Sequence, residues 1–192
     1  MTTEVFPYYF HPYQGAPWFY PMSGYWPPDH DGYYWHRYDR GPWGPWHPPV
    51  ELKDHGGKPF VVNIARAARQ NRYYRTALWT GKHLQVVLMS IAVGSDIGLE
   101  VHPRVDQFIR IEQGRGLVRM GERKDRLHVE RSVSDGDAIM IPAGTWHNVI
   151  NTGHVPLKLY TIYAPPEHPF GTMQRTKAEA MAEHRPLAAE KG

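Results

Sequence analysis

Cysteine is absent from this chain of 192 residues. Its absence excludes a disulfide framework, thiolate zinc sites, iron–sulfur clusters and thiol nucleophiles. Twelve histidines are present, so any metal chemistry has to use imidazole, carboxylate and amide ligands.

A clear excess of charge of one sign is also missing. Lys and Arg total 22 and Asp and Glu total 19, which leaves a net charge of +3. So weak a surplus gives no support to a nucleic-acid partner. We therefore expect a protein that does not bind nucleic acid.

Long hydrophobic runs are lacking as well. The longest begins at Leu84, ends at Gly94 and is interrupted by Gln85 and Ser90, so it is too short to cross a bilayer. The N-terminus has no basic stretch followed by an apolar one, and we predict no signal peptide. The expectation is a cytoplasmic protein without a membrane partner, with coat or surface association as the alternative.

Aliphatic residues are nearly missing from residues 1–50, where Val5 and Val50 are the only Val, Ile or Leu residues. The same segment holds 16 of the 25 aromatic residues and 10 of the 18 prolines. Proline at this density disfavours helix interiors and sheet ladders. The segment is expected to be an extension of turns whose rings lie against its own domain or a partner.

The remaining chain divides into three parts. Residues 51–72 are expected to form a linker with a short helix, Ile64–Gln70, capped by Asn63. Residues 73–165 contain short apolar runs separated by Gly, Pro and Asp, which predicts an all-β sandwich or barrel. Residues 166–192 are expected to form a tail whose capping box, Thr176 to Glu179, opens a short solvated helix ending near residue 184.

Nine strands are expected in the barrel. The run 84–93 is apolar on both faces, so both faces should be covered, one by a second sheet and the other by a partner or the aromatic extension. The expected strands are 75–80, 84–93, 98–102, 106–112, 116–121, 127–133, 137–141, 145–151 and 157–164.

Potential metal ligands occur in two segments of this region. Glu100 and His102 are two residues apart, so on a strand they point to the same face. Gln107 shares the alternation of Ile109 and should face inward. His147 follows a turn and, early in the next strand, should also face the barrel interior.

These two segments resemble the two motifs of the cupin family. Five residues match every fixed position of the second motif, G-x5-P-x-G-x2-H-x3-N: Gly136, Pro142, Gly144, His147 and Asn151. Three match the first motif, G-x5-HxH-x4-E-x6-G: Gly94, His102 and Gly114. The resemblance implies a cupin jelly-roll barrel, similar to small bacterial cupins often labelled mannose-6-phosphate isomerase-like.

The first motif departs from the family pattern at two ligand positions. Glu100 replaces the usual first His and Gln107 replaces the usual Glu. The resemblance then implies one divalent ion held by Glu100, His102, Gln107 and His147, with one negative ligand as in other cupins. Two nitrogens and two oxygens favour Mn²⁺, Fe²⁺ or Ni²⁺ and also admit Zn²⁺. A hydrogen-bonded cluster without metal is the alternative.

Three function classes follow. The leading hypothesis is a metal-dependent enzyme that isomerises a sugar or keto acid, or oxidises a small molecule with O₂, with Glu100 as a candidate base. The second is a non-catalytic protein that binds a small-molecule ligand. The third is a structural, coat-type protein acting through residues 1–50. A homodimer is expected, with a larger assembly through the extension as an alternative.

Overall fold

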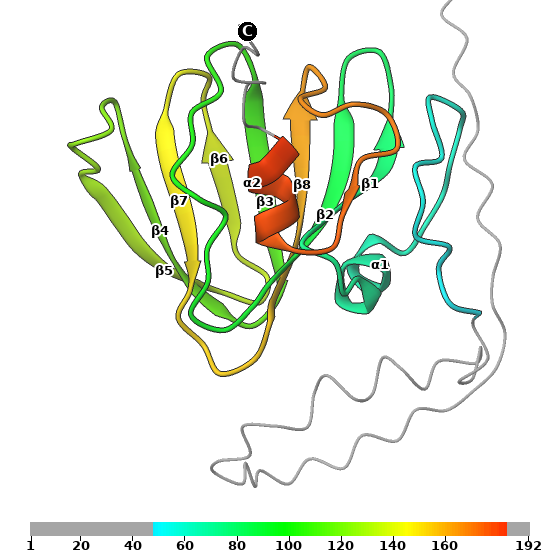
Figure 1. Cartoon of the computed structure of the whole chain (residues 1–192), viewed down its shortest axis with the longest axis horizontal. Coiled ribbons are helices and arrows are strands. Elements are labelled where there is room, and N and C mark those ends of the chain that lie inside the picture. Colours follow the sequence, from blue (N-terminus) through cyan, green and yellow to red (C-terminus); the bar gives the residue numbers. More distant parts are fainter. Residues whose placement is uncertain (1–47, 184–192) are drawn as a thin grey trace, which may run out of the picture. The chain divides into compact units, whose positions relative to one another are not determined.

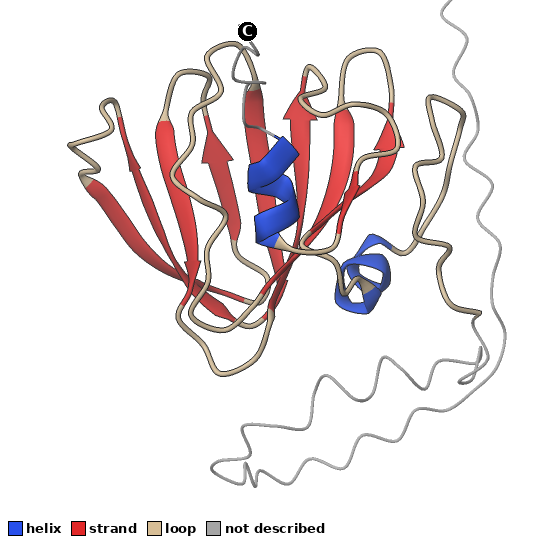
Figure 2. Ribbon diagram, viewed as in Figure 1, coloured by secondary structure: helices blue, strands red, loops and turns tan. Residues whose placement is uncertain are grey.

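The computed structural model describes residues 48–183, in which two antiparallel sheets form a jelly-roll barrel (Figure 1). The expectations for residues 1–47, and for a helix end near residue 184, lie outside the described residues. Strands dominate the described part, and of its two short helices one is drawn beside the sheets and the other in front of the strands (Figure 2). Neither helix is long and apolar enough to cross a membrane.

The larger sheet has six strands in the order β6-β3-β8-β2-β1-β9, and the smaller has three in the order β5-β4-β7. The strands of the larger sheet are β1 (Arg75–Thr80), β2 (Gln85–Ile91), β3 (Asp106–Gln113), β6 (Ala138–Ile141), β8 (Leu157–Ala164) and β9 (Met173–Gln174). Those of the smaller sheet are β4 (Arg115–Gly121), β5 (Val129–Ser134) and β7 (Trp146–Asn151).

One expected strand does not form as a regular strand. Residues 98–102 contribute a single bridge pair, Glu100 with His147, and Asp96 pairs with Ile150 slightly earlier in the chain. Gly98 has a φ of +87°, and Pro103 lacks an N–H, so the ladder does not continue on either side. This segment, residues 94–102, lies as an irregular edge along β7 and carries two of the candidate ligands.

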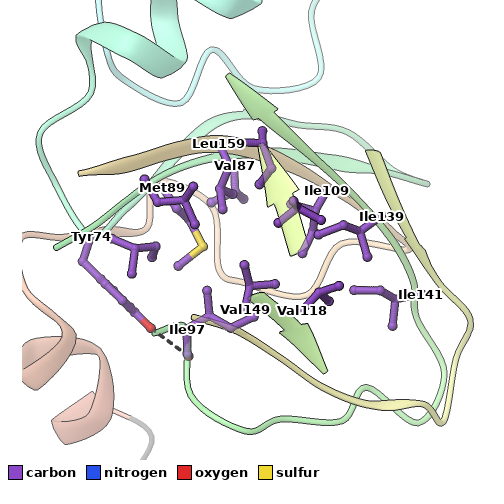
Figure 3. Packing of buried hydrophobic residues seen from close by; sticks show 14 of the residues in the cluster. Tyr74, Val87, Met89, Ile97, Ile109, Val118, Ile139, Ile141, Val149 and Leu159 are labelled. Atoms are coloured by element: carbon purple, nitrogen blue, oxygen red, sulfur yellow. Dashed lines mark hydrogen bonds between the residues drawn. The ribbon is translucent and has the colours of Figure 1, made fainter. Parts of the chain in front are cut away.

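The core lies between the two sheets. Inward side chains of β2, β3 and β8 meet those of β4 and β7, as Figure 3 shows for Val87, Ile109 and Leu159 against Val118 and Val149. All five are at most 2% exposed. At the edge of this cluster, the Tyr74 hydroxyl donates a hydrogen bond to the Ile97 carbonyl (2.8 Å) and holds the 94–102 segment against the core.

The outer face of β2 is covered by α1 (Ile64–Gln70), which is a correction to the expected cover by a partner or the aromatic extension. Ala67 and Ala68 are fully buried in a second cluster with Leu78 and Leu88. The predicted helix bounds are confirmed, and the Asn63 side chain accepts a hydrogen bond from the Arg66 N–H as a cap. Small alanine side chains allow the helix to approach the sheet closely.

The C-terminal helix α2 (Lys177–Glu183) is confirmed, but it is not fully solvated as expected. The Thr176 hydroxyl accepts from the Glu179 N–H (3.2 Å), which is half of the predicted capping box. Ala180 is 4% exposed and belongs to the core cluster, so one face of the helix is buried. The sequence pattern, rich in alanine and charge, did not reveal this contact.

Candidate metal centre

The backbone brings two separate chain segments together at one end of the barrel. The Glu100 N–H donates to the His147 carbonyl (3.0 Å), and the His147 N–H donates to the Glu100 carbonyl (2.9 Å). The Gly144 N–H donates to the His102 carbonyl (2.9 Å). Gly144 has a φ of +80°, which glycine adopts without strain. These bonds fix the segment 94–102 beside the turn that precedes β7.

Three of the four candidate ligands meet there. Glu100 Oε1 lies 3.4 Å from His102 Nε2 and 3.3 Å from His147 Nε2. One ligand atom from each residue lies within 4.8 Å of the other two, so the group could hold a metal ion. The His147 side chain is fully buried and that of His102 is 9% exposed, whereas 24% of the Glu100 side chain remains accessible.

The hydrogen bonds of the imidazoles define which nitrogens face the carboxylate. His147 Nδ1 lies 2.9 Å from the Thr145 carbonyl, and His102 Nδ1 lies 3.1 Å from Glu167 Oε1. Both partners are acceptors, so each Nδ1 carries a proton, and in the neutral imidazole each Nε2 presents a lone pair. Among the described residues neither Nε2 has a hydrogen-bond partner. With both imidazoles neutral, three lone-pair donors converge on one point, an arrangement that could hold a cation.

Burial and close neighbouring groups shift the pKa values of Glu100 and His102. Burial opposes ionisation of Glu100, but the close imidazoles of His102 and His147 outweigh it and lower its pKa to about 2. Burial alone would lower the pKa of His102, yet Glu100 and Glu167 raise it above its usual range. Protons and a metal ion therefore compete for the imidazole of His102.

Gln107, the fourth candidate, faces the interior as predicted. It is 4% exposed and occupies a cross-strand row with Ile141 on β6 and Tyr163 on β8. Its Nε2 donates to the Thr161 hydroxyl (3.0 Å), while Oε1 has no hydrogen-bond partner in the part of the chain that the structure describes. A buried amide oxygen without a partner is a candidate for an additional ligand.

Three aromatic residues of the barrel differ in their distance from this cluster. Tyr163 points inward, and its ring packs edge-on against His102 with centroids 5.5 Å apart, whereas Tyr160 joins the cluster beneath α1. Burial raises the pKa of the Tyr163 phenol, which stays protonated at neutral pH. Trp146, expected between the sheets or in substrate stacking, is half-buried on the face opposite His147 and lies under the Lys124 amine.

Glu167 is the site residue that sequence reasoning missed. It follows β8 in the run Pro165-Pro166-Glu167-His168-Pro169, at the predicted start of the C-terminal tail. A carboxylate beside an imidazole whose other nitrogen faces a ligand cluster is a common arrangement around metals. A Glu between prolines was the available signal, and spacing alone does not connect it to His102.

The motif residue Asn151 has a structural role. It is 1% exposed, and its Nδ2 donates to the carbonyls of Ile91 and Val155 (both 2.9 Å). Its Oδ1 accepts from the Gly153 N–H (2.9 Å). These bonds tie the end of β2 to the loop between β7 and β8.

The chain is similar to several known proteins. A family model described as a cupin domain matches residues 87–163. The chain is 70% identical over 131 residues to YrkC of Bacillus subtilis, which covers 68% of this chain and 70% of YrkC. It resembles the crystal structure of BH2720 from Bacillus halodurans with a TM-score of 0.68 and 66% identity, over 68% of this chain and 99% of that one. This chain belongs to the cupin superfamily.

More distant relatives extend the same cupin likeness. The protein L612 of Acanthamoeba polyphaga mimivirus is 47% identical over 113 residues, which is 58% of this cupin and 69% of L612. YrkC and L612 are both described as uncharacterized, so they indicate no reaction for this chain. The chemistry of this cupin has to be argued from its own residues.

Proposed function

We propose that this cupin binds one divalent metal ion through Glu100, His102 and His147 and acts as a metal-dependent enzyme on a small polar molecule. One observation carries the proposal: two buried imidazole nitrogens and a carboxylate oxygen converge, and neither nitrogen has a hydrogen-bond partner among the described residues. Leaving such acceptors unpaired in the interior costs free energy, and a cation removes that cost.

The donor set indicates the class of ion. Two imidazoles and one carboxylate, with the Gln107 oxygen as a fourth ligand, suit Mn²⁺, Fe²⁺, Ni²⁺ or Zn²⁺. The bound ion would supply Lewis acidity and open coordination positions for the oxygen atoms of a substrate. Sugar or keto-acid isomerisation and O₂-dependent oxidation can both use that chemistry.

The protein's own residues shape the approach to this ion. His147 and His102 are closed off from water, so a ligand reaches the cluster on the side of the more accessible Glu100. That accessibility supports Glu100 as the candidate base if one of its oxygens is free of the metal. The protonated Tyr163 lies next to His102, with the buried Gln107 beside Tyr163 on the neighbouring strand, and both exclude bulk water from the interior.

A non-catalytic ligand-binding protein is the second candidate, and the burial of both imidazoles favours it. Elemental analysis of protein purified without chelators tests metal binding, and about one ion per chain is expected. The Fe²⁺- and Mn²⁺-loaded protein is then incubated with sugars and 2-keto acids while O₂ uptake and isomer ratios are followed. If the purified protein contains no metal and does not bind added Fe²⁺ or Mn²⁺, the proposal is overturned. If it binds metal but converts none of these compounds, a non-catalytic ligand-binding protein is favoured.

Replacing Gln107 by Glu tests whether its oxygen binds the ion. The carboxylate fits, because the Thr161 hydroxyl that now accepts from Gln107 can instead donate. A second negative ligand should tighten metal binding by about tenfold or more, while lowering the Lewis acidity of the ion. Metal titration against a competing chelator measures the affinity. Gln113→Glu on the same strand is the control, and equal affinities in wild type and Gln107→Glu would place Gln107 outside the ligand set.

A further inference from the structure

The two candidate histidine ligands are held in different ways. His147 Nδ1 donates to a backbone carbonyl, that of Thr145, which the turn before β7 supplies. His102 Nδ1 instead meets a side-chain carboxylate, Glu167 Oε1, at 3.1 Å. Glu167 comes from a different part of the chain, the loop after β8. The orientation of His102 therefore depends on how firmly that loop is placed.

A buried glutamine fixes this loop. Gln85, the first residue of β2, is fully buried. Its Oε1 accepts from the His168 N–H (3.0 Å) and its Nε2 donates to the His168 carbonyl (2.9 Å). This pair of bonds copies the pairing of two antiparallel strands and clamps the backbone one residue after Glu167.

The clamp, formed by the Gln85 side chain and the backbone of residue 168, is held in place by two further side chains. Gln85 Nε2 also donates to the Thr80 hydroxyl (2.9 Å), and that hydroxyl donates to Asp54 Oδ2 (2.6 Å). The same Asp54 oxygen accepts from the Gly171 N–H (3.0 Å). The loop after β8 is thus tied to the body of the protein at residue 168 and again at residue 171.

We infer that Glu167 is a positioning residue for the metal centre and that Gln85 acts on the centre by positioning Glu167. The inference rests on the proposed metal site. A carboxylate on Nδ1 keeps the proton there, turns Nε2 toward the ion and makes the imidazole a stronger donor. It also brings a second negative charge close to the ion, which the carbonyl behind His147 does not.

Glu167 variants separate these contributions. Glu167→Ala removes both the hydrogen bond and the charge, and metal affinity should fall about 100-fold, the upper end for groups that support a ligand. Glu167→Gln keeps an acceptor for Nδ1 and should recover part of that loss, leaving a deficit of about tenfold. The matched control is Glu130→Gln, which changes an exposed carboxylate on β5 and should leave the metal affinity unchanged.

A double-mutant cycle tests the clamp. Gln85→Met should weaken metal binding in the wild-type background and have no further effect in Glu167→Ala, because the clamp acts through Glu167. The visible absorption bands of bound Co²⁺ should shift in Glu167→Ala and in Gln85→Met, since both change the geometry at His102. If Gln85→Met does not fold, Thr80→Val removes only the hydroxyl behind the clamp and replaces it in the cycle.

The outcomes are distinguishable. A wild-type protein that binds neither Co²⁺ nor Zn²⁺ overturns the proposed function before any variant is compared. Normal wild-type binding with unchanged affinity and Co²⁺ spectrum in Glu167→Ala overturns the positioning role. Equal losses from Gln85→Met in both backgrounds show that Gln85 acts independently of Glu167 and overturn the clamp.

Discussion

Purified His147→Ala protein is expected to lose its metal while keeping its fold. The imidazole is one of only two nitrogen ligands in the cluster, and its Nε2 lies 3.3 Å from Glu100 Oε1. Its removal should lower the affinity by more than about 100-fold, beyond the loss caused by changing a group behind a ligand. Elemental analysis should then find less than about a tenth of an ion per chain.

The control for this variant is His154→Ala, which changes an exposed histidine in the loop after β7. It should keep the full metal content. Circular dichroism and the melting temperature of metal-free samples show whether the barrel persists in His147→Ala. A folded His147→Ala protein with one tightly bound ion would move the metal away from this cluster.

Asn151→Asp is expected to give the opposite result, a large loss of stability without loss of the ligands. The substitution changes little in shape but turns the Nδ2 donor into an oxygen that faces the carbonyls of Ile91 and Val155. Two lost hydrogen bonds and a carboxylate buried against acceptors should lower the free energy of unfolding by about 3–5 kcal/mol. The melting temperature should fall by about 10 °C or more.

Asn63→Asp is the matched control, because Asp caps a helix as well as Asn does and this residue is exposed. Its unfolding free energy should stay within about 0.5 kcal/mol of wild type. Thermal unfolding of metal-free protein and metal titration well below the melting temperature separate the two effects. A stable Asn151→Asp protein would mean that the β2 end and the β7–β8 loop do not depend on this amide.

Local patterns were enough to predict most of the barrel. Strands such as β1 and β8 have the expected bounds, because turn residues and the alternation of side chains mark them directly. The inward direction of Gln107 followed from the same alternation. The strand expected at 98–102 was wrong in form, since Gly98 adopts a positive φ that no alternation reveals.

Long-range contacts account for what was missed. The residues of β2 do not indicate that α1 covers the outer face of this strand. The sequence of α2 likewise does not indicate that Ala180 enters the core. The sequence predicted three of the ligands because the cupin motifs fix the spacing of residues that meet in the folded barrel: Glu100, His102 and His147. Glu167 has no fixed spacing to them, and its part in the site depends on the bonds of Gln85 to a loop more than eighty residues later.

The pairing of Glu100 with His147 across an irregular edge also bears on how the protein matures. A chain leaves the ribosome N-terminus first, so Glu100 and His102 emerge before His147, and Glu167 follows only after β8. Until then the His102 imidazole lacks the Glu167 carboxylate, and the Gln85 side chain lacks its hydrogen bonds to residue 168. If Glu167 positions His102 as inferred, a chain that stops before Glu167 is therefore expected to bind metal more weakly than the finished barrel does.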